Sequence, residues 1–127
     1  MKKRVFIPQR DAADCGAACL ASVAAFYGLH ISVSRVRQYA GTDRQGTSLF
    51  GMMEAAKQLN FQVKGVKAAS ENLREIPFPS IFHLVLESCM QHFVVVYRVG
   101  RKRIVFMDPG IGKMIRQPVS LFIKNWS

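Results

Sequence analysis

The chain has 127 residues, of which half are apolar and 10% are aromatic. This length and composition suffice for one hydrophobic core without metal or disulfide staples, so we expect one domain over residues 1–127 and no intrinsic disorder. The net charge of +10 and the pI near 10.1 indicate attraction to an anionic partner. Nucleic acid, an acidic membrane face and an acidic peptide are the candidates.

The cysteines and the hydropathy pattern exclude several classes of protein. An odd number of cysteines (Cys15, Cys19 and Cys89) without a secretory signal argues against a disulfide framework and favours a reducing, cytosolic environment. The basic N-terminus has no apolar segment behind it, and no run of 18 apolar residues occurs, so we expect no membrane span in this chain.

The first expected element is a helix over residues 15–27, with Asp14 as its N-cap and Gly28 as its C-terminal stop. Its residues are rich in Ala, Leu and Val on nearly every face, and a helix that is apolar all round is usually buried. We therefore expect this helix at the centre of the fold.

Two further helices follow in the first half of the chain. The pattern predicts a short helix over about 34–40, ended by Gly41, and a third helix that begins at Thr47 or Ser48 and runs to about Leu59. The apolar positions of the third helix recur at spacings of three and four residues, which is typical of one buried helical face.

The second half of the chain changes to strands. Segments rich in β-branched and aromatic residues, or alternating in polarity, predict strands over residues 61–66, 80–86, 92–99 and 103–107. Gly100 marks a tight hairpin between the last two, and a short amphipathic segment over 121–126 closes the chain. Helices first and strands second predict an α+β fold, with N-terminal helices packed against a C-terminal antiparallel β-sheet.

Cys15 is the first candidate for chemistry, because it lies in the first turn of the expected central helix. Unpaired backbone amides and the positive end of the helix dipole favour the thiolate at such a position. A small core residue is an equally open interpretation from its position alone. Cys19 lies one turn deeper among Ala and Leu, so we interpret it as an inert buried thiol.

A histidine and an aspartate in the expected hairpin can supply a base and its orienting partner. His92 begins an apolar strand and Asp108 ends the next one, before the turn signal Pro109-Gly110. In a hairpin centred on Gly100, paired residue numbers sum to about 200, which places Asp108 within about one residue of His92 across the strands. An aspartate there fixes the histidine tautomer and supports its positive charge. A one-residue slip would turn Asp108 to the other face, and Asp-Pro-Gly alone is an ordinary turn signal.

Gln9 lies six residues before Cys15, in a segment that must pass near the start of the helix. Its side-chain amide can donate to a developing oxyanion together with the backbone N–H of Cys15. The other histidines are weaker candidates, because His30 is expected in an exposed loop and His83 half-buried within a strand.

These residues and their spacing resemble the active-site pattern of the C39 peptidases, the N-terminal domains of bacterial ABC transporters that mature and export bacteriocins and peptide pheromones. The similarity is most specific in the segment Gln9-x4-Asp14-Cys15-Gly16-Ala17-Ala18-Cys19-Leu20. It continues in order at Tyr27-Gly28, residues 41–47, residues 55–61, Pro79, residues 92–97 and Asp108-Pro109-Gly110. The resemblance thus covers nearly the whole chain.

The resemblance implies a papain-like cysteine peptidase fold, with Cys15 as nucleophile, His92 as base and acid, Asp108 as orienting residue and Gln9 in the oxyanion hole. It implies cleavage after a Gly-Gly or Gly-Ala pair at the end of a leader peptide, which binds as an amphipathic helix followed by an extended tail. Only two small residues fit the narrow slot expected beside the nucleophile. Such leaders are often acidic, which suits a chain of charge +10.

The resemblance also implies partners and a location. We expect the transmembrane and ATPase parts of an ABC transporter as partners, on the cytoplasmic side of the bacterial membrane. We expect no cofactor in this chain, with ATP bound only by the transporter. Family members usually continue beyond the position of Trp126 into another strand and a transmembrane region. Because this sequence stops at Ser127, we expect a cut-out domain or a short form that acts with separate transporter subunits.

Three alternatives to this interpretation have less support in the sequence. Family members that lack the cysteine only dock substrate, and the presence of Cys15 disfavours that role. A nucleic-acid binder rests on net charge alone, with no recognised motif, so we expect no nucleic-acid partner. A zinc site built from Cys15, Cys19 and His92 lacks an evident fourth ligand, so we expect no metal.

Overall fold

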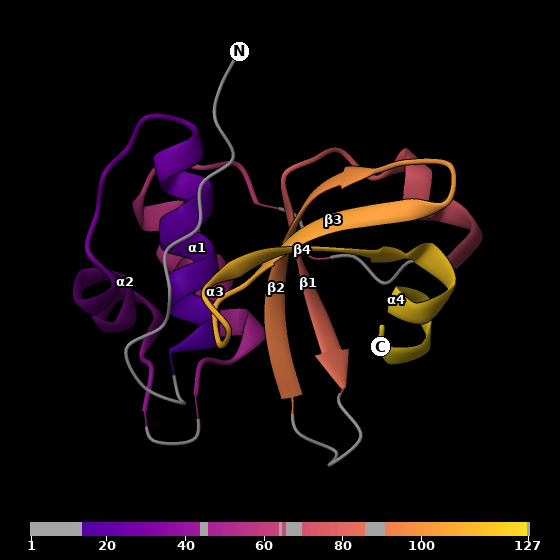
Figure 1. Cartoon of the computed structure of the whole chain (residues 1–127). Coiled ribbons are helices and arrows are strands. Elements are labelled where there is room, and N and C mark those ends of the chain that lie inside the picture. The colour runs from indigo at the N-terminus through magenta and orange to yellow at the C-terminus, as the bar shows by residue number, and fades with distance from the viewer. Residues whose placement is uncertain (1–13, 44–45, 64, 66–69, 86–90, 127) are drawn as a thin grey trace.

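The computed structural model describes residues 14–43, 46–63, 65, 70–85 and 91–126. The helical half, as we use the term, consists of α1 (Cys15–Phe26), α2 (Val33–Ala40) and α3 (Leu49–Gln58). The sheet half consists of β1 (Ser80–Val85), β2 (Gln91–Val99), β3 (Arg103–Asp108), β4 (Lys113–Pro118) and α4 (Val119–Asn125), and a 3-10 helix (Ser70–Glu75) precedes it. Figure 1 shows the two halves side by side, which confirms the predicted α+β class.

Helix α1 is the centre of the helical half because it presents small apolar residues on all sides. Eight of its twelve residues are buried, as the sequence predicted for this helix. Side chains this small let α2 and α3 approach α1 closely. The three helices share one apolar cluster, made of Ala17, Ala18, Leu20, Ala21, Val33, Val36, Ala40, Ala55 and Ala56.

Capping residues set the ends of α2 and α3. Ser32 Oγ accepts a hydrogen bond from the Arg35 N–H at 3.2 Å, and Ser48 Oγ accepts one from the Gly51 N–H at 3.0 Å. Gly41 ends α2 with a φ of 66°, a left-handed conformation that glycine adopts without steric cost. The predicted ends of these two helices are confirmed to within two residues.

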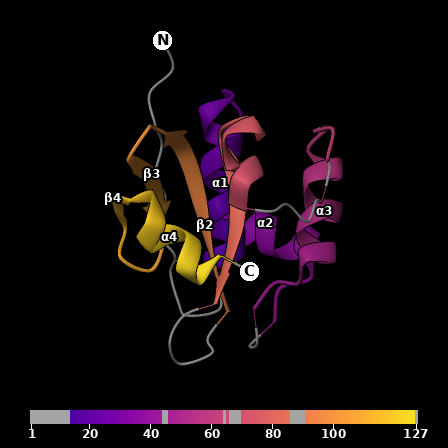
Figure 2. The same cartoon turned by 90° about the vertical axis from the view of Figure 1, so that its right-hand side faces the viewer.

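The sheet half is a meander in which each strand pairs antiparallel with the next, in the order β1-β2-β3-β4. Large apolar side chains on one face pack against α4 in a second cluster, made of Leu73, Phe82, Leu84, Val94, Val96, Ile104, Phe106, Val119 and Phe122. The other face of β2 packs against α1. Figure 1 shows β1 and β2 between α1 and α4, and Figure 2 shows the molecule from the side of α4. The strands predicted for β1, β2 and β3 are confirmed to within one residue.

The strand predicted over residues 61–66 is wrong for the described part of that segment. Residues 61–63 and 65 have no strand conformation. Phe61 and Val63 instead pack against the cluster of the helical half. An alternating pattern makes a strand only where a neighbouring strand completes the ladder, and here helices occupy that place.

Strand β4 was not among the strands that the sequence predicted. Its residues are exposed or half-buried and end in Pro118, so they lack the apolar alternation of a typical strand. The backbone nevertheless pairs with β3 from Asp108↔Lys113 to Arg103↔Pro118. The weak pattern follows from its place at the edge of the sheet, where charged residues and proline are common.

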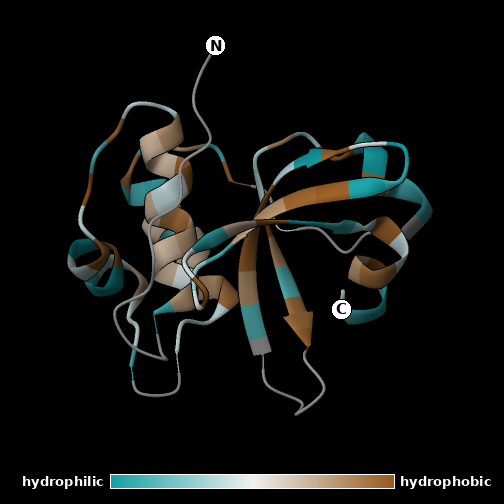
Figure 3. Ribbon diagram, viewed as in Figure 1, coloured by the Kyte–Doolittle hydropathy of each residue, from teal (hydrophilic) through white to brown (hydrophobic). Residues whose placement is uncertain are grey.

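A third apolar cluster joins the two halves. It contains Cys19 of α1, Met52 of α3 and, from the sheet, Phe93, Val95, Tyr97 and Met107. Figure 3 shows apolar colouring on both α1 and the nearby strands, whereas the turn between β2 and β3 is hydrophilic. Among the helices of the described residues, none has the length and apolar character needed to cross a membrane.

Candidate active site

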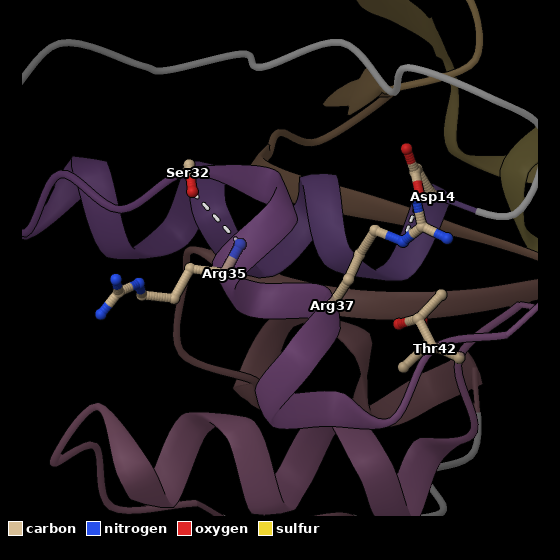
Figure 4. A network of polar contacts seen from close by, with 6 residues as sticks. Asp14, Ser32, Arg35, Arg37 and Thr42 are labelled. Carbon is tan, nitrogen blue, oxygen red and sulfur yellow. Dashed lines mark hydrogen bonds and ion pairs between the residues drawn. The ribbon is translucent and has the colours of Figure 1, made fainter.

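Cys15 opens α1 and packs, partly buried, against the cluster that joins the two halves. Asp14 occupies the N-cap position, as predicted, but within the described residues its side chain makes no capping hydrogen bond. Its carboxylate instead forms an ion pair with Arg37 of α2, with 3.1 Å between Nε and Oδ1 (Figure 4). The side chain of Asp14 therefore leaves the first amides of α1 to other acceptors.

Gly16 lets the start of α1 fit tightly against its neighbours. A Cβ atom at this position would lie 3.0 Å from Met52 Sδ, 3.2 Å from Thr47 Cβ and 3.4 Å from a Phe93 ring carbon. Only a residue without a side chain therefore fits between α3 and β2 without a shift of those neighbours. This close approach brings the neighbouring Cys15 to the beginning of β2.

His92 and Asp108 form a short hydrogen bond at the end of the sheet nearest to Cys15. The distance between His92 Nε2 and Asp108 Oδ1 is 2.6 Å, and only 11% and 17% of the two side chains are exposed. The Gly110 N–H donates to the same Asp108 oxygen at 2.9 Å, so the turn after β3 helps to hold the carboxylate. The structure thus brings together the histidine and the aspartate that the sequence predicted to meet.

A bulge in β2 sets the register that makes this contact. On the hairpin side of Tyr97, paired residue numbers sum to 203, as in Val99↔Ile104. On the other side of Tyr97, toward the start of β2, they sum to 202, as in Val95↔Met107. Continued by one residue, the second register places Asp108 opposite Val94, on the same face as His92. Without the extra residue Asp108 would lie opposite Val95 and face the other way. The predicted sum of about 200 is close, and the contact is diagonal rather than directly opposite.

The side chain of His92 is also hydrogen-bonded to the Cys15 thiol. Because Nε2 faces Asp108, Nδ1 is the ring nitrogen available to the sulfur. Burial raises the pKa of the thiol, but the hydrogen bond and positive charge of His92, together with the Phe93 and Gly16 amides, outweigh it, and the pKa falls below its ordinary value of 9.0. Hydrogen bonds to Asp108 and to Cys15 raise the pKa of His92 to about 9 against the effect of burial.

The carboxylate of Asp108 completes a row of alternating charges. Burial raises the pKa of this carboxyl group, but the hydrogen bond to His92, the positive charge of His92 and the backbone amides of Gly110 and Ile111 together lower it below 3.8. These shifts favour a thiolate beside an imidazolium and a carboxylate, and a thiolate is the nucleophilic form of cysteine. Cys19 differs, since burial raises its pKa well above 9.0 and keeps it a thiol.

Of the remaining candidates from the sequence, Gln9 falls outside the described residues, and the two other histidines lie away from this row. His30 is exposed, and the half-buried ring of His83 packs on Phe93 with 5.2 Å between ring centroids, as expected for both. In the described part of the chain, no three His, Cys, Asp or Glu side chains gather as metal ligands.

Two features near the site were missed by the reasoning from sequence, namely the backbone amide of Phe93 beside the Cys15 sulfur and the side chain of Arg37 paired with Asp14. The Gly16 amide is one of the helix-start amides that the sequence led us to expect near the sulfur. The position of Gly16 directly after the cysteine could have indicated a close approach of neighbouring backbone. Arg37 carried no signal, because one basic residue on an amphipathic helix is most often solvated.

A cysteine at the start of a buried helix, set against an antiparallel sheet that carries a histidine and an aspartate, defines the class of papain-like folds. The chain belongs to the Peptidase C39 family, whose sequence model matches residues 3–127. The family resemblance and the papain-like fold expected from the sequence are both confirmed.

Curated relatives are much longer than this chain. Lactococcin-G-processing and transport ATP-binding protein LagD of Lactococcus lactis subsp. lactis is 42% identical over all of the chain. Transport/processing ATP-binding protein ComA of Streptococcus pneumoniae is 31% identical over 98% of it. The chain spans only 18% of the length of either protein.

Solved structures of peptidase domains superpose closely on the chain. The peptidase domain of Streptococcus ComA, a bi-functional ABC transporter, gives a TM-score of 0.91 at 34% identity, covering 98% of this chain and 93% of that one. A double glycine motif protease from an AMS/PCAT transporter, solved in complex with the leader peptide, gives 0.89 at 30% identity, covering 99% and 88%.

Proposed function

We propose that this chain is a cysteine endopeptidase that removes double-glycine leader peptides from bacteriocin or pheromone precursors. The observation that carries the proposal is the hydrogen-bonded row of Cys15, His92 and Asp108, in which the thiol has a lowered pKa and the imidazole a raised one. Membership of the Peptidase C39 family and the likeness to a double glycine motif protease support the same reaction.

The charges of the site suit a two-step acyl transfer. The Cys15 thiolate attacks the carbonyl carbon of the second glycine, and His92 gives its proton to the departing amine of the mature peptide. Water then attacks the thioester, and His92 takes one of its two protons. The leader leaves as a carboxylic acid that releases the other proton to solvent, and the thiolate and imidazolium are restored. Asp108 keeps the ring oriented and its positive charge stabilised throughout.

The oxyanion of each tetrahedral intermediate needs hydrogen-bond donors. The start of α1 offers backbone N–H groups near Cys15, and the positive end of the helix dipole favours negative charge there. We assign the second donor to the side chain of Gln9, as the family pattern implies. Replacing Gln9 with Ala should then lower kcat more than it changes KM.

Exposed apolar side chains at the start of α3 and in the turn after β3 suit the apolar anchors of an amphipathic leader. Leu49 and Phe50 are 58% and 72% exposed, and Met52 of the same helix lies against Gly16. Ile111, which is 59% exposed, lies in the turn whose Gly110 amide holds Asp108. An apolar helix face laid across these side chains would present an extended tail to Cys15.

The proposed partners follow from the relatives rather than from this chain alone. LagD and ComA are described as processing and transport ATP-binding proteins, and the structural relatives as domains of an ABC transporter and of an AMS/PCAT transporter. We infer that this chain works with the transmembrane and ATPase parts of such a transporter, on the cytoplasmic side of the membrane. ATP would be bound by the transporter and not by this chain.

Incubation with a precursor peptide tests the proposal directly. A precursor with a Gly-Gly junction should yield two fragments whose masses place the cut after the second glycine. A precursor with Val-Val at that junction should stay intact. Binding of the precursor without any cut by the folded chain would favour a docking role and contradict the proposed reaction. The lowered pKa of Cys15 disfavours that docking role.

A further inference from the structure

Basic side chains gather around the hairpin between β2 and β3, at the end of β2 that lies away from the proposed active site. They are exposed and line one shallow, open depression. The cations are Arg98 of β2, Arg101 and Lys102 of the turn, Arg103 of β3 and Arg116 of β4. We call this depression with its five cations the basic hairpin surface.

The pairing of the strands brings three of these cations to one face of the sheet. Arg98 and Arg116 are each paired with Val105 of β3, so the two arginines flank it from both neighbouring strands. Arg103 lies two residues before Val105 and therefore shares its face. Because neighbouring strands lie ~4.8 Å apart, the Cα atoms of the three arginines lie within about 10 Å of one another.

The described structure does not offset this concentration of positive charge. Among the residues that the structure describes, none of the five cations takes part in an ion pair, and no acidic residue lines the depression. Like charges on adjacent strands destabilise a sheet. Charges on an edge strand protect against aggregation, but β2 is a central strand, so that role does not explain Arg98.

Hydrogen bonds hold the turn that carries the surface. The Gly100 N–H donates to the Arg103 carbonyl at 2.7 Å and closes the turn. The guanidinium of Arg74, on the 3-10 helix, donates to the carbonyls of Gly100 and Arg101 at 3.0 and 2.7 Å. The cations are therefore presented on a fixed framework, and Arg74 adds its own positive charge beside them.

We propose that the basic hairpin surface binds the anionic phospholipid headgroups of the membrane beside which this chain works. Clusters of Lys and Arg side chains bind anionic lipid surfaces, and each cation adds to the attraction. The inference rests on the proposed function in one respect, which is the place of the chain beside a transporter. In that place the membrane surface is the nearest extended array of negative charge.

Other anionic partners fit this surface less well. No aromatic residue lines it, whereas proteins that bind single-stranded nucleic acid stack the bases on aromatic side chains. None of the exposed large apolar side chains in the described part of the chain lines it either, so an acidic peptide would find charge but no apolar anchor. A lipid surface needs neither, because its headgroups form a broad plane of negative charge.

The position of the surface suits a chain that cleaves peptides while it is docked. His92 and Arg98 lie near opposite ends of β2, six residues apart, which is about 20 Å of extended strand. Docking through the hairpin would therefore keep the row of Cys15, His92 and Asp108 clear of the headgroups. The leader contacts proposed on α3 and in the turn after β3 would also stay free.

Sedimentation of the folded chain with lipid vesicles tests the inference without any peptide. Vesicles of phosphatidylcholine alone are compared with vesicles that also contain phosphatidylglycerol, and the bound fraction is measured as the salt concentration rises. The parent chain should bind only the anionic vesicles and should be released by salt, because salt screens charges at a surface. Absence of binding to the anionic vesicles at low salt would overturn the proposal.

Two variants of equal net charge separate the basic hairpin surface from the charge of the whole chain. The surface variant carries three changes: Arg98→Gln, Arg103→Gln and Arg116→Gln. The control variant replaces three exposed cations of α2, α3 and α4: Arg35→Gln, Lys57→Gln and Lys124→Gln. At about fivefold for each cation, the surface variant should bind anionic vesicles about a hundredfold more weakly than the parent. The control should bind nearly as the parent does, and an equal loss in both variants would contradict the proposal.

Two further outcomes would assign the surface to a different partner. Tighter and more salt-resistant binding of the parent to duplex DNA than to anionic vesicles would overturn the proposal in favour of nucleic acid. Loss of precursor binding by the surface variant in free solution, with vesicle binding retained, would overturn it in favour of the leader. Vesicle binding is independent of cleavage. A chain that binds vesicles as expected but never cuts a leader would refute the proposed reaction and leave the membrane contact intact.

Discussion

The helical half and the sheet half are packed tightly by side chains of opposite size. The cluster shared by α1, α2 and α3 is dominated by alanine, whereas the cluster under α4 is built from Phe, Leu, Ile and Val. Small side chains bring helix backbones close together, and large ones fill the space between a sheet and a helix. The two halves therefore differ in the kind of change that each can tolerate.

The proposed active site depends on both kinds of packing at once. The helical half positions Cys15 through the close packing at Gly16. The sheet half positions His92 and Asp108 through the register of β2 and β3. Each half thus holds part of the chemistry, and the interface cluster sets the distance between the parts.

Removal of the nucleophile should have the largest effect on activity. Cys15→Ala should lower the rate of leader cleavage by about 10⁴-fold or more, because no other group in the row can attack a carbonyl. Cys19→Ala is the matched control, since Cys19 is buried one turn deeper on the same helix. Mass spectrometry of a precursor digest measures both. Cleavage by Cys15→Ala at the parental rate would contradict the proposed mechanism.

Core substitutions should destabilise the two halves through opposite changes in side-chain volume. Phe122→Ala removes a fully buried ring from the sheet half and should cost about 3–5 kcal/mol of unfolding free energy. Ala18→Leu adds volume to the fully packed helical half and should cost about 1–3 kcal/mol. Urea denaturation measures both. A neutral Ala18→Leu would show that the helical half has spare room, contrary to the comparison.

Asp108→Asn should weaken the support that the sheet half gives to the charged form of His92, without disturbing the fold. An amide cannot support the imidazolium as a carboxylate does, so we expect kcat to fall by about 10²–10⁴-fold. Glu71→Gln, on the exposed 3-10 helix, changes the charge equally and should have no effect. Steady-state kinetics with a leader peptide distinguish the two variants, and equal activities would exclude Asp108 from the reaction.

The pH profile of kcat/KM should report the ion pair directly. Activity needs the Cys15 thiolate, whose pKa is lowered, and protonated His92, whose pKa is about 9. The rate should therefore fall as the pH rises through about 9, because the imidazolium is lost. The two pKa values that such a profile reports describe the coupled Cys15–His92 pair rather than either group alone. Since Asp108 is the largest cause of the raised pKa of His92, Asp108→Asn should move this alkaline limb to lower pH.

The smallest effect is expected from the exposed apolar side chains that we propose as contacts of the leader. Phe50→Ala should raise KM about fivefold with little change in kcat, because one exposed anchor of the leader is lost while the chemistry is untouched. Leu121→Ala, on α4 of the sheet half, removes another exposed apolar side chain and is the control. An unchanged KM for Phe50→Ala would place the leader elsewhere on the surface.

Elements with a strong local pattern were predictable from the sequence. The apolar helix behind Asp14 and the hairpin around Gly100 follow from periodicity and turn chemistry, and their positions are confirmed. Strand β4 and residues 61–63 show the limit of such patterns. An edge strand needs little apolar alternation, whereas an alternating segment without a partner strand stays irregular.

The site was predictable in its residue types but not in its geometry. His92 and Asp108 were expected to meet, yet the bulge at Tyr97 decides which face Asp108 occupies, and no single residue in the sequence indicates a bulge there. The pairing of Asp14 with Arg37 depends on how α2 docks against α1, which is a tertiary feature. Capping propensity alone indicated the opposite use of Asp14.

The contact between the two halves, from sulfur to imidazole, is tested most directly by comparing the parent chain with His92→Gln. The rate of Cys15 alkylation is followed as the pH is lowered, with Cys15 resolved from the other cysteines by peptide mapping. The parent should stay reactive well below pH 9, and His92→Gln should lose that reactivity because its thiolate has no cationic partner. Identical profiles for the two proteins would contradict the ion pair on which the proposed reaction depends.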